Sequence, residues 1–319
     1  MKTTFIITSL AAMMLSMAGH AFAANTETIA PDETYLFAKR DTCELYLDVY
    51  KAAEGSESTF EGKKKPTVIF LFGGGFIKGT RDHKSYHKWF KMMTENGYQV
   101  VSIDYRLGLK GSNKVGIAQV NQLDKAIHMG VEDLYSATRY LIDNAEELNI
   151  DPENIVISGS SAGAIIVMQA EYELCNRRSW AAALPEGFRY AGVMSFSGAI
   201  LSREGFVDYN IAPCPTLMMH GTADKLVPYN QIKILNLGFF GGGKLIKRFK
   251  KFNFCYNMFH FIDYGHEIAG AMETTLDLQL DFLETNVMQG KKRIIEAWLS
   301  DPDVYKGAGP QSRKELYGK

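Results

Sequence analysis

One short segment places a nucleophilic side chain among unusually small neighbours. Residues 154–165 read NIVISGSSAGAI, in which a β-branched run leads into the G-x-S-x-G pattern of residues 159–163. On a sharp strand-to-helix turn, a serine needs a backbone strained toward positive φ and small neighbours that let strand and helix approach. Gly159 and Gly163 supply those neighbours, so the segment predicts that Ser161 is held out as a nucleophile.

A serine hydroxyl becomes a good nucleophile only when a base takes its proton. The sequence offers HGTAD at 220–224 and YGHE at 264–267, and each lies at the end of a predicted strand. His266 is the predicted base, and Asp224 is predicted to hold the imidazole tautomer and to stabilise the imidazolium. The chain order Ser161, Asp224, His266 therefore predicts nucleophilic catalysis by these three residues.

Other histidines and aspartates compete for these roles. His220 also lies at a strand end, but it precedes the aspartate and fits the turn by which the chain leaves the strand. His260 lies within an alternating strand, where a packed histidine is usual. Asp208 and Asp263 are the rival acids. His266 is favoured because it lies beyond its strand and before a predicted helix, and Asp224 because it lies in the HGTADKLVP segment.

A glycine-rich segment, FGGGF at residues 72–76, follows the first predicted buried strand. Acyl transfer puts negative charge on a carbonyl oxygen, and preorganised backbone N–H groups stabilise that charge by about 3–4 kcal/mol each. Consecutive glycines let bare amides approach the oxygen. The sequence therefore predicts an oxyanion hole formed by Gly74, Gly75 and Ala162, the last at the start of the helix after Ser161.

These residues must be positioned by strands that end at one edge of a sheet. Continuous apolar runs alternate with helical patterns, which predicts a mostly parallel sheet with helices on both faces. Active residues of such sheets collect beyond the carboxyl ends of the strands. We therefore predict an α/β fold with a mostly parallel eight-stranded sheet and an antiparallel N-terminal start. The predicted strands lie in TYLFAKR, CELYLDVYKA, TVIFLF, YQVVSIDYR, NIVISG, YAGVMSFSG, PTLMMHG and YNMFHFID, and the predicted helices span 124–148, 162–174 and 266–283.

The two ends of the chain differ from its middle. Residues 1–23 combine Lys2, an apolar run and an A-x-A site, which predicts a secretory signal peptide. We predict that residues 24–319 form a single domain, with a short terminal helix and a polar tail over about 291–319. The predicted location is exported, either periplasmic or extracellular. No later apolar stretch reaches the length of a membrane span, so stable membrane insertion is not expected.

Composition argues against several partners and cofactors. A formal net charge of −1 at pH 7 argues against a nucleic-acid binder. The basic run KLIKRFKK at 244–251 has the period of a helix with a solvated face. The four cysteines lack C-x-x-C spacing, so no metal is predicted. Cys214 and Cys255 could form a disulfide between neighbouring strands, or all four thiols could stay reduced. GFFGGGKL at 238–245 lacks the hydroxyl of a P-loop, and no cofactor is predicted.

Together the motifs resemble the carboxylesterase and hormone-sensitive-lipase branch of the α/β-hydrolase superfamily. The matching segments are FGGGF, IDYRL at 103–107, DPENIVISGSSAGA at 151–164, HGTAD and the GH at 265–266. One position departs, because Phe72 stands where that family has the histidine that braces the glycine loop. The resemblance implies the α/β-hydrolase fold and a secreted serine carboxylesterase that acts through an acyl-enzyme. Its implied substrates are small-molecule or carbohydrate esters, with acetyl or feruloyl esters of polysaccharides among them.

Two other functions are left open by the sequence. A serine exopeptidase of the same fold would use the same three residues, although no propeller or extra N-terminal domain is predicted to gate peptides. The third hypothesis is a non-catalytic binding module. Loops at 108–124 and 175–190 are expected to decide what is bound, and Trp180 could stack on a sugar or an aromatic acyl group. The oligomeric state is also left open.

Overall fold

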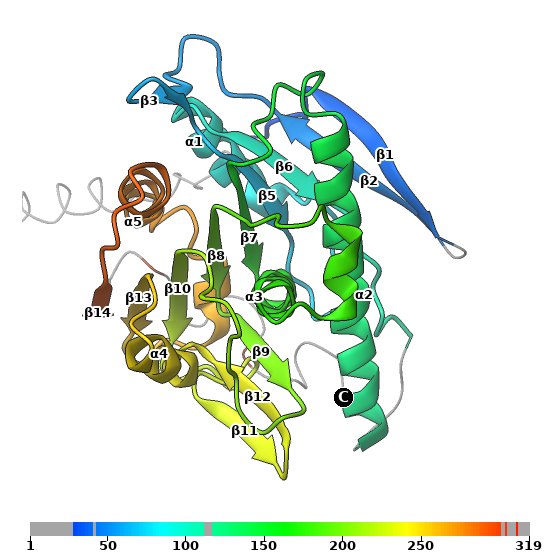
Figure 1. The fold of residues 1–319 in the computed structure, drawn as a ribbon, viewed down its shortest axis with the longest axis vertical. Coiled ribbons are helices and arrows are strands. Elements are labelled where there is room, and N and C mark those ends of the chain that lie inside the picture. The colour runs from blue at the N-terminus through cyan, green and yellow to red at the C-terminus, as the bar shows by residue number, and fades with distance from the viewer. Residues whose placement is uncertain (1–27, 41–42, 112–116, 301–303, 305–310, 312–319) are drawn as a thin grey trace, which may run out of the picture.

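Nine strands pair into one sheet in the computed structural model, which describes residues 28–40, 43–111, 117–300, 304 and 311 (Figure 1). The predicted signal peptide lies outside the described residues. In order across the sheet the strands are β1 (Glu33–Arg40), β2 (Cys43–Tyr50), β6 (Gln99–Ile103), β5 (Thr67–Leu71), β7 (Ile155–Ser160), β8 (Gly192–Phe196), β10 (Thr216–Gly221), β13 (Tyr256–Phe261) and β14 (Ile295–Leu299).

The pairing confirms the predicted sheet type. β2 is antiparallel to β1 and to β6, and each neighbouring pair from β6 to β14 is parallel. Every residue of β5, β7, β8, β10 and β13 is buried. Such continuous apolar runs are typical of parallel strands that helices cover on both faces. The outer strand β1 is only partly buried, as its alternating sequence predicted.

The ninth strand lies where the sequence analysis predicted a helix. Residues 295–299 form β14, which pairs in parallel with β13 at the edge of the sheet. The predictions of eight strands and of a helix at this point are therefore wrong. The segment IIEAWL is short, β-branched at its start and half-exposed, and a short apolar run of this kind fits either element.

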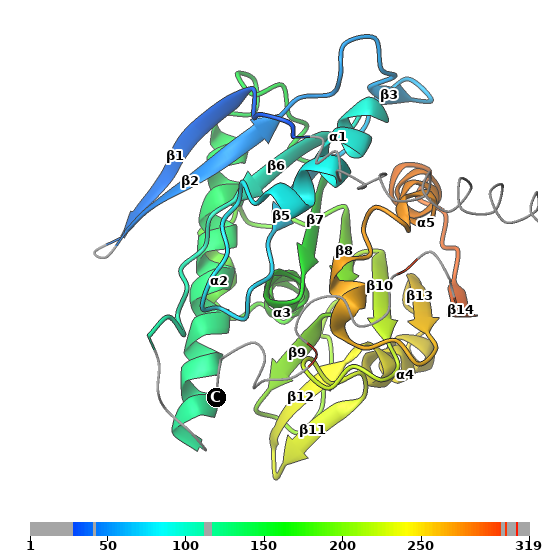
Figure 2. The same cartoon turned by 180° about the vertical axis from the view of Figure 1, so that it is seen from behind.

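Helices cover both faces of the sheet. α2 (Ile117–Asp143) and α3 (Ala162–Cys175) cover one face (Figure 1), whereas α1 (His87–Glu95) and α5 (Leu276–Phe282) cover the other (Figure 2). A buried hydrogen bond of 2.9 Å from Trp89 Nε1 to Gln279 Oε1 joins α1 to α5. On α4 (Gly242–Lys251), the apolar side chains are buried and Lys247, Lys250 and Lys251 are exposed, as the basic run predicted. Short 3₁₀ turns cover Lys84–Tyr86, Ser179–Ala183 and His266–Gly270.

The helix predicted over 266–283 is interrupted. A 3₁₀ turn covers its first residues, α5 begins only at Leu276, and a π-helical turn follows at Leu283–Met288. The hydroxyls of Thr274 and Thr275 both donate to the carbonyl of Ala271, at 3.2 and 2.7 Å. Such local bonds compete with a regular helix. His266 therefore lies on a tight turn directly beyond β13. The predicted 124–148 helix is α2, which lies some residues earlier.

The strand ends share one edge, and this alignment brings distant residues together. Leu71, the last residue of β5, pairs with Gly159 of β7. Gly221, the last residue of β10, pairs with Phe261 at the end of β13. The glycine-rich loop therefore starts beside Ser161, and the loops that carry Asp224 and His266 start beside each other.

Two smaller sheets lie outside the main one. One has the order β11 (Gln231–Ile234), β12 (Leu237–Gly241), β9 (Ala199–Ser202), and the other pairs β3 (Thr59–Phe60) with β4 (Lys63–Lys64). Cys214 and Cys255 are free thiols, so the considered disulfide is not formed. Among the described helices, none is long and apolar enough to cross a membrane.

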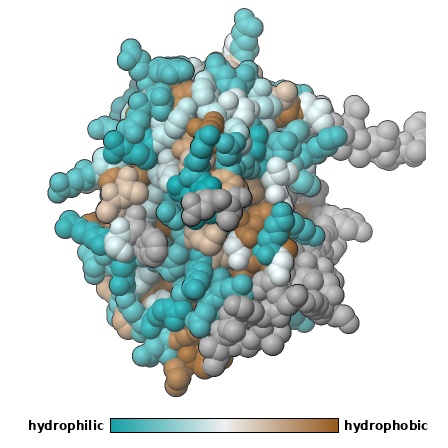
Figure 3. All heavy atoms as spheres, turned by 90° about the vertical axis from the view of Figure 1, so that its right-hand side faces the viewer, coloured by the Kyte–Doolittle hydropathy of each residue, from teal (hydrophilic) through white to brown (hydrophobic). Residues whose placement is uncertain are grey.

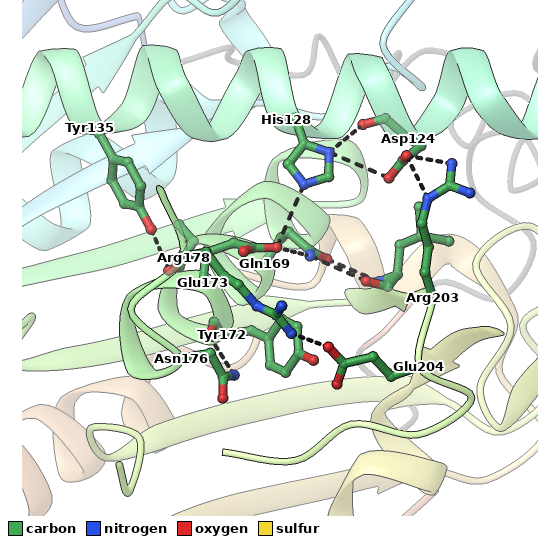
Figure 4. A network of polar contacts seen from close by, with 12 residues as sticks. Asp124, His128, Tyr135, Gln169, Tyr172, Glu173, Asn176, Arg178, Arg203 and Glu204 are labelled. Atoms are coloured by element: carbon green, nitrogen blue, oxygen red, sulfur yellow. Dashed lines mark hydrogen bonds and ion pairs between the residues drawn. The ribbon is translucent and has the colours of Figure 1, made fainter. Parts of the chain in front are cut away.

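A polar network joins α2, α3 and the residues after β9 (Figure 4). His128 Nδ1 lies 3.3 Å from Asp124 Oδ1, and its Nε2 lies 3.6 Å from Glu173 Oε1. Arg203 NH2 also donates to Asp124, at 2.6 Å, and Gln169 donates to Glu173, at 2.7 Å. Burial would lower the pKa of His128, but hydrogen bonds to the two carboxylates outweigh burial and raise that pKa to about 10.

Candidate active site

Ser161 lies on a strained turn between β7 and α3. Its φ is 51° and its ψ is −112°, a conformation that L-residues rarely adopt. The turn is crowded, because a Cβ on Gly159 would lie 2.3 Å from the carbonyl carbon of Gly163, and one on Gly163 would lie 2.0 Å from the oxygen of Leu71. The backbone is fixed by a 2.9 Å bond from Ser161 N to Phe196 O. The small residues therefore permit this turn, which holds the serine beyond the strand end.

The structure brings the three predicted catalytic side chains together. Ser161 Oγ lies 2.7 Å from His266 Nε2, and His266 Nδ1 lies 2.8 Å from Asp224 Oδ2. All three residues are at most 9 % exposed. The rival residues are elsewhere engaged: His260 hydrogen-bonds Tyr229, and Asp208 pairs with Arg248. The arrangement allows a proton to move from the serine to a histidine whose other nitrogen faces a carboxylate.

Asp224 is held as a carboxylate by several donors. Its Oδ1 accepts from the backbone N–H groups of Leu226 and Val227, at 2.9 and 3.0 Å. His220 Nε2 lies 3.4 Å from Asp224 Oδ2. Burial alone would raise the pKa of Asp224, but hydrogen bonds from His220 and His266 outweigh it and hold that pKa well below its usual range.

His220 therefore lies next to Asp224. The sequence analysis had assigned this histidine only to a turn. Gly242 N donates to His220 Nδ1 at 3.4 Å, so the ring proton lies on Nε2. That nitrogen faces Val227 O at 3.1 Å as well as Asp224. The sequence signal for this contact was the four-residue separation of His220 and Asp224 in HGTAD. That separation brings the two side chains together only because the chain turns directly after β10.

The glycine-rich loop passes beside Ser161, since a Cβ on Gly73 would lie 3.2 Å from Ser161 Cβ. Gly74 lines the same cavity as Ser161, whereas Gly75 does not. Gly74 has φ +130°, and a Cβ there would lie 1.9 Å from the carbonyl oxygen of Lys78. Gly75 follows with φ 65°. Within the described chain, neither of these two N–H groups donates to a protein acceptor. Ala162 is the first residue of α3, and the N–H of a first-turn residue has no partner within its helix.

Two tyrosines brace this loop near Phe72, the position where the esterase branch that the sequence resembles has a histidine. Phe72 stacks on Tyr105 with ring centroids 4.4 Å apart, and the Tyr105 hydroxyl donates to Phe72 O at 2.9 Å. The Tyr86 hydroxyl accepts from Gly73 N at 2.9 Å. These contacts tie the loop to a residue that follows β6 and to one that precedes α1. Sequence reasoning missed Tyr86 and gave no role to Tyr105, although Tyr105 lies in the matching segment IDYRL.

A cavity of about 740 Å³ opens onto Ser161 and His266. The two loops expected to decide specificity contribute none of its described lining, although residues 112–116 and the Trp180 side chain lie outside the described residues. The 175–190 segment follows the whole of α3, which carries it about 20 Å from the nucleophile. Most of the remaining lining comes from the glycine loop and the residues after it, or from the residues after His266, with Ser160 from the end of β7 and Leu226 from the segment after Asp224. The full set is Phe72, Gly73, Gly74, Lys78, Gly79, Thr80, His83, Ser85, Tyr86, Ser160, Leu226, Glu267, Ala269, Gly270, Ala271, Met272, Glu273, Thr274 and Val304.

The chain resembles known proteins over part of its length. A family model named BD-FAE matches residues 47–177, a stretch that contains the glycine loop and Ser161. Gut esterase 1 of Caenorhabditis briggsae is 34 % identical over 107 residues, which cover 34 % of this chain and 18 % of that protein. Neuroligin-2 of Mus musculus is 31 % identical over 157 residues, which cover 44 % of this chain and 18 % of that protein. The chain thus spans about a fifth of the length of these relatives.

Solved structures match over a larger share. A propionate-bound esterase of the planctomycete Thermogutta terrifontis aligns with a TM-score of 0.57 at 23 % identity, and the alignment covers 79 % of this chain and 93 % of that one. The same esterase phosphonylated by sarin aligns with a TM-score of 0.56. These likenesses establish the fold. Among the described residues, no group of three or more histidine, cysteine, aspartate or glutamate side chains is placed to hold a metal ion.

Proposed function

We propose that this chain, an α/β-hydrolase that resembles esterases over its first half, is a serine carboxylesterase that works through an acyl-enzyme. The observation that carries the proposal is the pair of contacts from Ser161 Oγ to His266 Nε2 and from His266 Nδ1 to Asp224, at 2.7 and 2.8 Å. They lie at the wall of a cavity large enough for a small ester.

In the acylation step, His266 Nε2 takes the proton of Ser161 as Oγ attacks the ester carbonyl carbon. The negative charge that forms on the carbonyl oxygen is stabilised by the N–H groups of Gly74, Gly75 and Ala162. Asp224 holds the imidazole with Nε2 facing the serine and stabilises its positive charge. His266 then gives its proton to the departing alkoxide, so the C–O bond breaks and an alcohol leaves.

In the deacylation step, a water molecule takes the place of the alcohol. His266 removes a proton from the water, the resulting hydroxide attacks the acyl carbon, and the same N–H groups stabilise the second oxyanion. The proton returns to Ser161 Oγ as the carboxylic acid is released. No cofactor is needed to balance either step.

For the substrate, we propose small or carbohydrate-linked esters, acetyl and feruloyl esters of polysaccharides among them, and an exported enzyme. The cavity supports this because its lining includes the hydroxyl side chains of Thr80, Ser85 and Thr274 and the charged side chains of Lys78 and Glu273, which suit a sugar. The signal-like N-terminus supports export.

The deciding experiment compares ester and amide turnover by the protein purified without its first 23 residues. We expect hydrolysis of p-nitrophenyl acetate that Ser161→Ala abolishes. The control Ser158→Ala, which changes a buried serine on the strand leading to Ser161, should leave it intact. Activity only on an aminoacyl-p-nitroanilide would instead show the exopeptidase, and silence on both substrates would favour a binding module. A panel of acetylated and feruloylated oligosaccharides then identifies the acyl group.

A further inference from the structure

A second surface, which differs in chemistry from the cavity, contains most of the exposed apolar side chains. We call it the hairpin face: the β11–β12 hairpin together with Phe206 and α4 through Phe252. Five of the eight large apolar residues exposed in the described chain lie on it. In Figure 1 the turn between β11 and β12 is the lowest point of the ribbon, and in Figure 3 the lowest part of the surface is hydrophobic. The five residues are Phe206, Ile232, Ile234, Leu235 and Phe252.

The tip of the hairpin carries exposed apolar side chains, and one of them lies on a strained backbone. Leu235 is 88 % exposed and Ile234 is 71 % exposed. Leu235 also has φ 54°, a conformation in which turns normally use glycine or asparagine. A strained leucine that contacts so little of its own chain contributes little to folding. Such a residue at the tip suggests an apolar environment outside the protein.

The hairpin face is also strongly basic. A cavity of about 360 Å³ on it is lined by basic side chains and by no carboxylate. Arg248 pairs with Asp208 and lies over the rings of Phe206 and Phe252. Within the described residues, the lysines of the lining form no ion pair with a carboxylate. These lysines are Lys233, Lys244, Lys247 and Lys251.

We propose that the hairpin face adsorbs to the surface of an anionic lipid membrane. Ile234 and Leu235 enter the boundary between headgroups and acyl chains, while the lysines contact lipid phosphates, the combination by which peripheral proteins bind bilayers. A second copy of this chain fits poorly, because a symmetric contact would oppose the same lysines. An anionic polysaccharide would use the lysines but leave the apolar tip in water.

The test measures co-sedimentation of the protein, purified without its first 23 residues, with vesicles of phosphatidylcholine alone or mixed with phosphatidylglycerol. We expect binding to the anionic vesicles and weak binding to the neutral ones. Ile234→Ser/Leu235→Ser and Lys244→Gln/Lys247→Gln should each weaken binding by about tenfold or more. The matched controls are Ile262→Ser/Ile294→Ser and Lys63→Gln/Lys110→Gln, which change exposed residues elsewhere.

Three results would overturn the proposal. Equal binding to both vesicle types, or no binding to either, would exclude an anionic membrane as the partner of the hairpin face. Binding that only the lysine variant weakens points to a soluble anionic polymer, which dextran sulfate competition would reveal. A dimer in sedimentation that the tip variant dissociates assigns the face to a second copy. Turnover of p-nitrophenyl acetate should be the same in all four variants, so these results are independent of the proposed esterase activity.

Discussion

Tyr86 offers a sharp test of how the glycine loop is held. Its hydroxyl accepts the Gly73 N–H at 2.9 Å, and its ring packs against Phe70 with centroids 4.7 Å apart. Tyr86→Phe keeps the ring contact and removes only the hydroxyl. The Gly73 N–H then loses its acceptor, and an unpaired polar group in a shielded position costs about 1–3 kcal/mol.

The loop can escape that cost by moving, and movement misplaces the adjacent Gly74 N–H relative to the oxyanion. Since about 1.4 kcal/mol corresponds to a factor of ten, we expect kcat on p-nitrophenyl acetate to fall by about 10- to 100-fold. KM should change little, because the oxyanion forms only in the transition state.

The matched control is Tyr98→Phe, since Tyr98 is fully buried and its hydroxyl has no hydrogen-bond partner among the described residues. Its kcat should equal that of the unmodified protein. A Tyr86→Phe protein with unchanged kcat would show that the brace is dispensable. A rise in KM together with a fall in kcat, and an equal loss of activity in Tyr98→Phe, would attribute the effect to a general loosening of the structure.

Three further predictions concern the acid, the polar network and the turn. Asp224→Asn should lower kcat by about 10³–10⁴-fold without loss of the folded state, because the amide favours the wrong imidazole tautomer; circular dichroism checks the fold, and a fall below tenfold contradicts the assignment. His128 has a raised pKa of about 10, so its stabilising charge is fully present below about pH 6.5 and is lost as pH rises toward 10. The unfolding free energy should fall over that window by at most about 5 kcal/mol, and urea titrations should show a smaller fall in His128→Gln. Gly163→Ala should lower the urea midpoint or prevent soluble expression, since its Cβ would lie 2.0 Å from Leu71 O; an unchanged midpoint would contradict the close packing.

The sequence predicted the features of the fold and the site that depend on patterns within one segment of the chain. Continuous apolar runs identified the buried parallel strands, and small residues around Ser161 identified the turn. It also predicted which histidine and aspartate would meet the serine, because parallel strands end at one edge. The structure brings these side chains within hydrogen-bonding distance.

What the sequence could not predict depends on contacts between distant segments. β14 is too short and too exposed to be told from a helix before its pairing with β13 is known. Tyr86 lies in no motif, and His220 lies in HGTAD without a role that the motif assigns. Each acquires its contacts only because another loop folds beside it. The cavity lining differed from expectation for the same reason: α3 carries the 175–190 loop away from the nucleophile, while the residues after the glycine loop stay close.

The backbone angle of Ser161 implies a conflict between durability and reactivity. At φ 51° and ψ −112° a glycine would be less strained than any residue with a side chain. Ser161→Gly is therefore expected to melt at a higher temperature than the natural chain while losing all turnover. The position would then be one where selection has kept the less robust protein for what it can do.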